Sequence, residues 1–153
     1  MAEILTQKIK DAIADAESLK SIATVDKNGV PHVVYKGSLH INKEGNLEFY
    51  DILESSKINQ NLVYAIWFGK KVAVHILTKD KKSYEITGAP LKSVTSGREF
   101  EEVYQKLLER NPKGDLNAIW TIVPENVREE TFAVRVKESA EQYPVLGHLD
   151  RFV

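Results

Sequence analysis

Asn46-Leu-Glu-Phe-Tyr-Asp-Ile-Leu-Glu-Ser-Ser-Lys-Ile-Asn-Gln-Asn-Leu62 is the stretch that decides the fold of this chain. Its first half, residues 47–52, predicts a strand, and its second half predicts a helix that opens on Ser55, Ser56 and Lys57. The first turn of a helix has backbone N–H groups without intrahelical partners and a partial positive charge. Two hydroxyls and an ammonium group there predict a pocket for a phosphate. An ordinary N-cap beside a solvated lysine explains the same residues without a ligand.

Hydrophobic spacing and turn residues extend the prediction to the whole chain. The expected helices cover residues 2–19, 55–69 and 96–110, and the expected strands cover residues 21–26, 30–36, 47–52, 72–77, 84–88, 116–123 and 131–137. Asn28-Gly29 predicts a tight hairpin, because both residues tolerate positive φ. Gly69 is a natural end for the second helix.

Three local patterns refine these elements. The second helix is expected to bury one face made of Ile58, Leu62, Ala65 and Ile66. Ser96 and Glu99 form a capping-box pattern for the third helix. That helix is expected to turn Phe100, Val103, Tyr104, Leu107 and Leu108 inward, and residues 124–126 are expected to form a turn between the last two strands.

Hairpins outnumber βαβ units in this pattern, so antiparallel pairing is expected. Closure into a small barrel would remove exposed sheet edges. The sequence therefore predicts an α+β fold, a small antiparallel barrel with helices packed outside, with a helix-covered open antiparallel sheet as the alternative. We expect a single domain over residues 1–153, with a core at about 3–137 and an irregular tail at 140–153.

The composition excludes several classes of function. With 42% hydrophobic and 28% charged residues, the 153-residue chain has the composition of a globular protein. Its net charge of −1 offers no field that would attract nucleic acid or acidic membranes. No cysteine, membrane-length apolar run or signal pattern occurs in the printed sequence. We therefore expect a cytoplasmic protein that binds neither nucleic acid nor membrane.

Common catalytic and metal motifs are missing. The sequence contains no G-x-G-x-x-G, P-loop, G-x-S-x-G or H-E-x-x-H pattern. The four histidines are scattered, and no metal site is predicted. His75 alternates into a hydrophobic strand, so we expect it to be a hydrogen-bonded structural residue. No catalytic residue can be named from the sequence.

Asp51 and Lys36 are the remaining candidates near the predicted phosphate turn. Strand alternation places Asp51 on the same face as Leu47 and Phe49, and an inward carboxylate requires partners or a pocket. It could bind a ligand's polar groups or cap the following turn. Lys36 ends the preceding strand on the face of Val34, either as a snorkelling edge lysine or as a second cation for the anion. Two cations near one helix start would repel each other unless an anion lies between them.

These segments together resemble a known family. His32-Val-Val-Tyr-Lys-Gly37, Leu47-Glu-Phe-Tyr-Asp51 and Glu54-Ser-Ser-Lys57 with Asn61-Leu62 are similar to the FMN-binding split β-barrel proteins related to pyridoxamine 5′-phosphate oxidase. The order of elements agrees over about residues 3–137. The resemblance implies a split barrel, FMN as cofactor, and a homodimer with the flavin at the subunit boundary. It implies flavin contacts at His32, Val33, Val34, Tyr35, Lys36, Tyr50, Asp51 and Ser83, and phosphate contacts at Ser55, Ser56, Lys57 and Asn61.

The sequence departs from that family at three places. The oxidase proper has arginine where Ser56 stands and glutamine where Ser83 stands. Its C-terminal segment, which closes the substrate site, has no match in residues 138–153. The resemblance thus implies FMN binding more than pyridoxamine phosphate oxidation itself. The tail at 143–151, which includes Gly147, His148, Leu149, Asp150 and Arg151, suggests no mechanism.

The sequence therefore supports an FMN-dependent oxidoreductase that passes electrons or hydride to a small acceptor, with NAD(P)H as a candidate donor. FMN and a deazaflavin are not distinguished by the sequence. A carrier that binds flavin or haem without turnover is the alternative. An oligonucleotide-binding barrel is a third reading, against which the near-neutral charge argues.

Overall fold

The computed structural model describes residues 3–144 of the 153-residue chain. The described part contains seven strands and four helices. In chain order these are α1 (Gln7–Ala14), β1 (Leu19–Val25), β2 (Pro31–Tyr35), β3 (His40–Ile41), β4 (Leu47–Asp51), α2 (Lys57–Phe68), β5 (Val72–Leu77), β6 (Ser83–Val94), α3 (Arg98–Arg110), β7 (Ala118–Glu129) and α4 (Phe132–Gln142).

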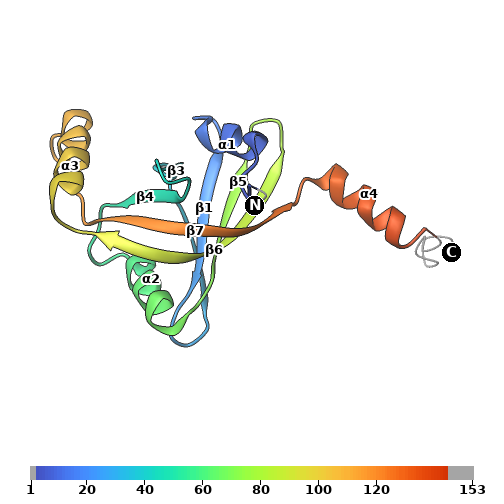
Figure 1. Cartoon of the computed structure of the whole chain (residues 1–153), viewed down its shortest axis with the longest axis horizontal. Coiled ribbons are helices and arrows are strands. Elements are labelled where there is room, and N and C mark those ends of the chain that lie inside the picture. Colours follow the sequence, from blue (N-terminus) through green and yellow to red (C-terminus); the bar gives the residue numbers. More distant parts are fainter. Residues whose placement is uncertain (1–2, 145–153) are drawn as a thin grey trace.

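The seven strands form one antiparallel sheet in the order β2-β1-β5-β6-β7-β4-β3. The sheet curls into a half-barrel, with α2 below it and α1 above it in Figure 1. β6 and β7, at twelve residues each, are the long central strands. The α+β class and the antiparallel split barrel predicted from the sequence are confirmed. The edge strands β2 and β3 are not paired with each other, so the curl remains a half-barrel.

One hydrophobic core fills the inside of the curl. Alternate residues of β1, β5 and β6 point inward because successive strand side chains point to opposite faces. Phe49 and Trp120, from the paired strands β4 and β7, are among the largest fully buried side chains. The buried face of α2 and the apolar side of α1 complete the core.

The second helix agrees closely with its prediction. α2 has Ser56 as its N-cap and ends at Gly69, whose φ of 63° lies in the left-handed region. Ile58, Leu62 and Ala65 are buried as predicted. Ile66 was expected to join them, but it is 42% exposed, and Asn61 is buried instead. The buried face of α2 therefore includes Asn61 in place of Ile66.

The end of the chain differs most from the prediction. The expected strands at 116–123 and 131–137, with a turn at 124–126, are one continuous strand, β7, followed by the helix α4. Pro124 does not end the strand, because a register shift in the β6–β7 pairing accommodates it. Residues 140–142 belong to α4 rather than to an irregular tail. One short strand, the two-residue β3, was not predicted from the sequence.

The predictions for α1 and α3 were also wrong in part. α1 is shorter than the expected helix at 2–19, because β1 already begins at Leu19. The capping box at Ser96 and Glu99 does not form: Gly97 is the N-cap of α3 and makes no side-chain cap bond. The predicted inward stripe of α3 is only half-buried, and no residue of α3 is fully buried.

Gly88 lies beside the register shift between β6 and β7, where the two backbones are close together. A Cβ atom there would lie 2.2 Å from the Val123 carbonyl oxygen. We expect Gly88→Ala to lower the free energy of unfolding by about 1–3 kcal/mol, the usual range for overpacking, as measured by urea denaturation.

Gly37→Ala is the matched control. Its Cβ would meet only the hydroxyl end of the exposed Tyr35 side chain, at 3.1 Å. We expect a change within about 0.5 kcal/mol, as at most surface positions. Equal losses in the two variants would contradict the close approach of the two strands.

Candidate functional site

Asp51 is the centre of the predicted site, and it is fully buried at 0% exposure. Its Oδ1 lies 3.1 Å from Nζ of Lys36. Its Oδ2 accepts a hydrogen bond of 2.7 Å from the Ser56 hydroxyl. The carboxylate is thus used within the protein, which is the turn-capping role that the sequence left open. It joins the end of β2, the end of β4 and the start of α2.

Ser56 continues this network into the helix. Its Oγ accepts the Asn59 backbone N–H at 3.1 Å and so caps α2. The Asn59 side-chain oxygen accepts the Trp120 indole N–H at 3.0 Å. The orientation of α2 is therefore fixed from β4 and β7 at its first turn. The backbone N–H groups of Lys57 and Ile58 have no intrahelical acceptor, by helix geometry.

Lys57 projects toward the β1–β2 turn and is half-exposed. Its Nζ lies 3.7 Å from Asp26 Oδ2. Asp26 accepts the backbone N–H groups of Val30 and Asn28, and above all the Val30 bond holds the pKa of Asp26 below its ordinary value. Lys36 and Lys57 were expected to need a bound anion between them. Each instead has a protein carboxylate as partner.

The predicted residues of β2 divide between the two faces of the strand. Val33 and Tyr35 are 67% and 57% exposed. His32 and Val34 lie on the other face and are half-buried. An aromatic ligand lying flat on one face of β2 would contact only one of these pairs. The expected contact set from His32 to Lys36 thus requires a ligand that also uses the strand's backbone.

Tyr50 and Asp51 also point in opposite directions. The Tyr50 ring lies on the side of α3, where it borders a hollow of 140 Å³ with Val103 and Leu107. Burial, followed by the nearby Glu48 carboxylate, raises the pKa of the Tyr50 phenol. Its backbone N–H donates to the Ser38 hydroxyl at 3.0 Å. Tyr50 remains a hydrogen-bond donor at neutral pH, but it faces away from the Asp51 carboxylate.

Asn61 and Ser83 lie outside the cluster at the first turn of α2. Asn61 is 3% exposed and donates to the Thr24 hydroxyl at 2.9 Å, which ties α2 to β1. Ser83 lies 2.7 Å from His75 Nε2 through its hydroxyl and donates its backbone N–H to Thr131. His75 is hydrogen-bonded as expected, although it is exposed. Contacts of Asn61 and Ser83 with a cofactor stay predictions.

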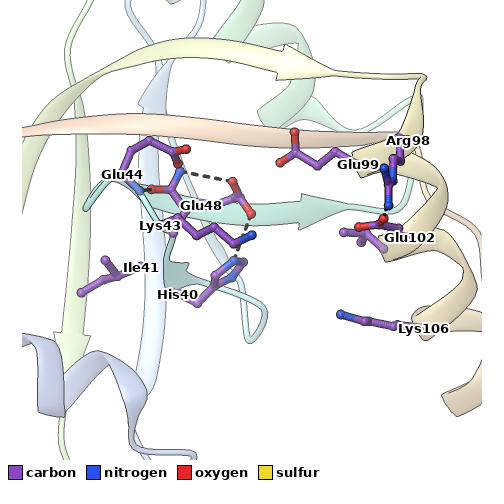
Figure 2. A pocket seen from close by; sticks show the side chains of 11 residues that line it. His40, Ile41, Lys43, Glu44, Glu48, Arg98, Glu99, Glu102 and Lys106 are labelled. Atoms are coloured by element: carbon purple, nitrogen blue, oxygen red, sulfur yellow. Dashed lines mark hydrogen bonds and ion pairs between the residues drawn. The ribbon is translucent and has the colours of Figure 1, made fainter.

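A second hollow of 760 Å³, which sequence reasoning missed, lies between β3–β4 and α3. In Figure 2, His40 and Glu48 lie on one side of it and Glu99, Glu102 and Lys106 on the other. His40 Nε2 lies 3.1 Å from Glu48, whose second oxygen accepts from Asn42. None of the predicted phosphate residues lines this hollow. No sequence pattern signals it, because it depends on where α3 lies.

Two further findings concern the described residues alone. Among residues 3–144, no three histidine, aspartate or glutamate side chains gather in a way that could hold a metal ion. None of the helices in this range is long and apolar enough to cross a membrane. The distinctive segment at 147–151 lies outside the described residues.

The sequence matches no protein-family model and no curated protein. The fold, however, is shared with solved structures. An FMN-binding protein from Syntrophomonas wolfei has a TM-score of 0.64 at 12% identity, over 84% of this chain and 87% of that one. A candidate pyridoxamine 5′-phosphate oxidase from Lactobacillus delbrueckii has a TM-score of 0.61 at 18% identity, over 81% and 93%.

HutZ, described as the haem storage protein of Vibrio cholerae, has a TM-score of 0.54 at 18% identity, over 83% of this chain and 95% of that one. The structural neighbours are thus split-barrel proteins like those related to pyridoxamine 5′-phosphate oxidase, and they include binders of different cofactors. At these identities the likeness shows a shared fold. The resemblance drawn from the sequence is confirmed at that level.

Removal of Lys36 and removal of Asp51 from their buried pair are expected to destabilise the protein by different amounts. Lys36→Met leaves a fully buried carboxylate without its cation, so we expect a loss of about 3–5 kcal/mol in the free energy of unfolding. Asp51→Asn leaves Lys36, whose side chain is 15% exposed and can reach water. We expect that variant to lose about 1–3 kcal/mol, the range for one lost hydrogen-bonding partner.

Urea denaturation of both single variants and the double variant measures these values. The double variant should lose less than the sum of the singles, because the two residues interact directly. A larger loss for Asp51→Asn than for Lys36→Met would show that the ion pair is not what holds this corner together.

Proposed function

We propose that this protein binds FMN and acts as an oxidoreductase that transfers electrons or hydride to a small acceptor. The observation that carries the proposal is the open first turn of α2. Ser55 is exposed, Lys57 is half-exposed, and the Lys57 amide lacks a helical acceptor. The turn is held in place from behind by Asp51 and Trp120. A phosphate there would receive amide, hydroxyl and ammonium donors together.

The charges of the corner are compatible with this ligand. The Asp51 charge is offset by Lys36, so it does not repel an anion strongly. The Lys57–Asp26 contact of 3.7 Å is long and half-exposed, and pairs of this kind contribute about 0–1 kcal/mol. Lys57 can therefore turn toward a phosphate at little cost. FMN binding by a protein of the same fold supports the choice of ligand.

The flavin would supply the redox chemistry, and the protein residues would bind and orient it. Val33 and Tyr35 offer an exposed apolar surface on the edge strand β2, which a second subunit would complete. We therefore propose a homodimer with the cofactor near the subunit boundary. This arrangement requires no acid–base dyad from the chain, in agreement with the lack of a catalytic motif.

A carrier that binds flavin or haem without turnover is the second candidate. The observation that favours it is the structural match to HutZ, which is described as a haem storage protein. The absorbance of the purified protein distinguishes flavin, with bands in the blue and near ultraviolet, from haem, with its intense Soret band. A preparation that retains haem but not FMN would favour the carrier.

Lys57→Ala tests the phosphate position. Loss of one charge-assisted hydrogen bond should weaken FMN binding by about 1.5–3 kcal/mol, or roughly 10- to 150-fold in Kd. Quenching of flavin fluorescence on binding measures the Kd. Lys70→Ala, an exposed lysine beyond the other end of the same helix, is the matched control and should bind normally. Equal FMN affinities for the unaltered protein, Lys57→Ala and Lys70→Ala would show that the phosphate does not bind at this turn.

An anaerobic reduction assay separates the oxidoreductase from the carrier. We expect NADH or NADPH to bleach the bound flavin, and an added quinone or dye acceptor to restore its colour. The Lys57→Ala protein, reconstituted at saturating FMN, should retain this cycle because Lys57 is proposed to hold only the phosphate. A flavin that stays oxidised with both donors would favour the carrier.

A further inference from the structure

We propose that α4 is an exchanged arm, which packs against the outer face of α2 on a second copy of this chain. The inference rests on the homodimer of the proposed function, but not on its flavin. It concerns two surfaces whose apolar residues are exposed within the part of the chain that the structure describes, residues 3–144. One is a stripe on α4, and the other is the outer face of α2.

The point where α4 leaves the barrel is firmly held. Thr131 is 8% exposed, and its hydroxyl accepts the Ser83 backbone N–H at 2.9 Å. The Glu130 backbone N–H donates to the Ser83 carbonyl at 2.8 Å. These bonds fix the end of β7 against the start of β6, and α4 begins at the next residue. Figure 1 shows α4 extending away from the barrel, on the far side from α2 of the same chain.

The arm carries an apolar stripe into solvent. Phe132, Val136, Ala140 and Tyr143 recur at helical spacing and so lie on one side of the helix. Phe132 is 81% exposed and Val136 is 48% exposed. An isolated helix of eleven residues is marginal in water. An amphipathic helix of this length therefore requires a surface against which to bury its stripe.

The outer face of α2 is a matching surface. Val63, Ile66 and Trp67 recur at i, i+3 and i+4 on the side of α2 opposite its buried residues, and Trp67 is 79% exposed. α2 and α4 have twelve and eleven residues, so both are about 16–18 Å long. They can lie side by side over their full lengths.

The exchange also reaches the area that a stable dimer needs. A two-fold axis makes the contact twice, with Phe132 and Tyr143 from the arm and Trp67 from the outer face of α2 each time, beside the aliphatic residues of both stripes. Aromatic side chains bury roughly 150–250 Å² each. The two contacts together would bury on the order of 1,200 Å², the lower range of stable interfaces. One contact between an arm and an unrelated protein would bury about half as much.

The first experiment measures the molar mass of the full chain without ligand, by light scattering during size exclusion over a range of concentrations. We expect a dimer whose Kd rises at least tenfold in both Phe132→Ser and Trp67→Ser. Val30→Ser, which alters a 51%-exposed residue of the β1–β2 turn, should leave the Kd unchanged. A monomeric wild-type chain would overturn the proposal, as would a dimer that neither variant weakens.

The second experiment does not depend on how those variants fold. The natural chain has no cysteine, so a Val136→Cys chain mixed with a Val63→Cys chain can form a mixed disulfide only between copies. We expect this product to dominate over either symmetric product under mild oxidation. A Leu91→Cys chain, altered at an exposed site of β6, replaces Val63→Cys as the control. A yield of the Val136→Cys/Val63→Cys disulfide no higher than that of the Val136→Cys/Leu91→Cys control would overturn the exchange.

These outcomes also distinguish the arm from the proposed function. A dimer that binds FMN and whose Kd is unchanged in Phe132→Ser and Trp67→Ser would contradict the exchanged arm and leave the flavoprotein proposal intact. A dimer that requires both residues but never binds FMN would support the arm and count against the cofactor.

Discussion

One buried carboxylate ties the β2 edge of this curled sheet to β4 and to α2. β2 and β3 lie at opposite ends of the sheet order, so no ladder of backbone hydrogen bonds joins them. Asp51, the last residue of β4, links that strand to the β2 edge and to α2, because one of its oxygens contacts Lys36, just beyond β2, and the other accepts from Ser56 at the start of α2. An ionised group without exposure is tolerated only when it is paired and hydrogen-bonded. The barrel edge, the β4 end and the helix start therefore form one unit.

This arrangement changes how the candidate phosphate site works. The sequence suggested two cations in need of an external anion, whereas the protein supplies Asp51 and Asp26 as their partners. Attraction for a phosphate must then come from the exposed side of the turn, from the Lys57 amide, the Ser55 hydroxyl and the Lys57 ammonium group. Ser56 cannot serve in the same way, because its hydroxyl already donates to Asp51 and accepts from Asn59. The buried half of the corner is structural, and the exposed half is available to a ligand.

The sequence predicted those features that depend on neighbouring residues alone. The positions of α2 and of the inward face of β4 follow from residue spacing, capping and Gly69, and each was found nearly where expected. β7 and α4 were misjudged because Pro124 reads as a strand end unless the neighbouring strand shifts its register, which is a property of two strands together. The His40–Glu48 hollow was missed for a related reason: its far wall is α3, and no local pattern gives the position of that helix. Of the predicted site, the residues from Asp51 to Lys57 come together, while Tyr50, Asn61 and Ser83 point elsewhere.

The exposed apolar stripes of α3 and α4 share a physical explanation. An amphipathic pattern states that a helix requires a partner surface, but it does not state that the partner belongs to the same chain. In this chain the core is already filled by the sheet, α1 and α2, so the stripes of α3 and α4 have no internal surface left to cover. α3 lies across a hollow from β3 and β4 with its stripe half-buried, and the start of α4 is held at Glu130 and Thr131 through their bonds to Ser83. A helix whose pattern requires burial, but whose own barrel has no room for it, is most simply completed by another copy of the same barrel. The inward stripe expected of α3 was wrong for this reason, because its pattern indicated the need for a partner surface but not where that surface lies.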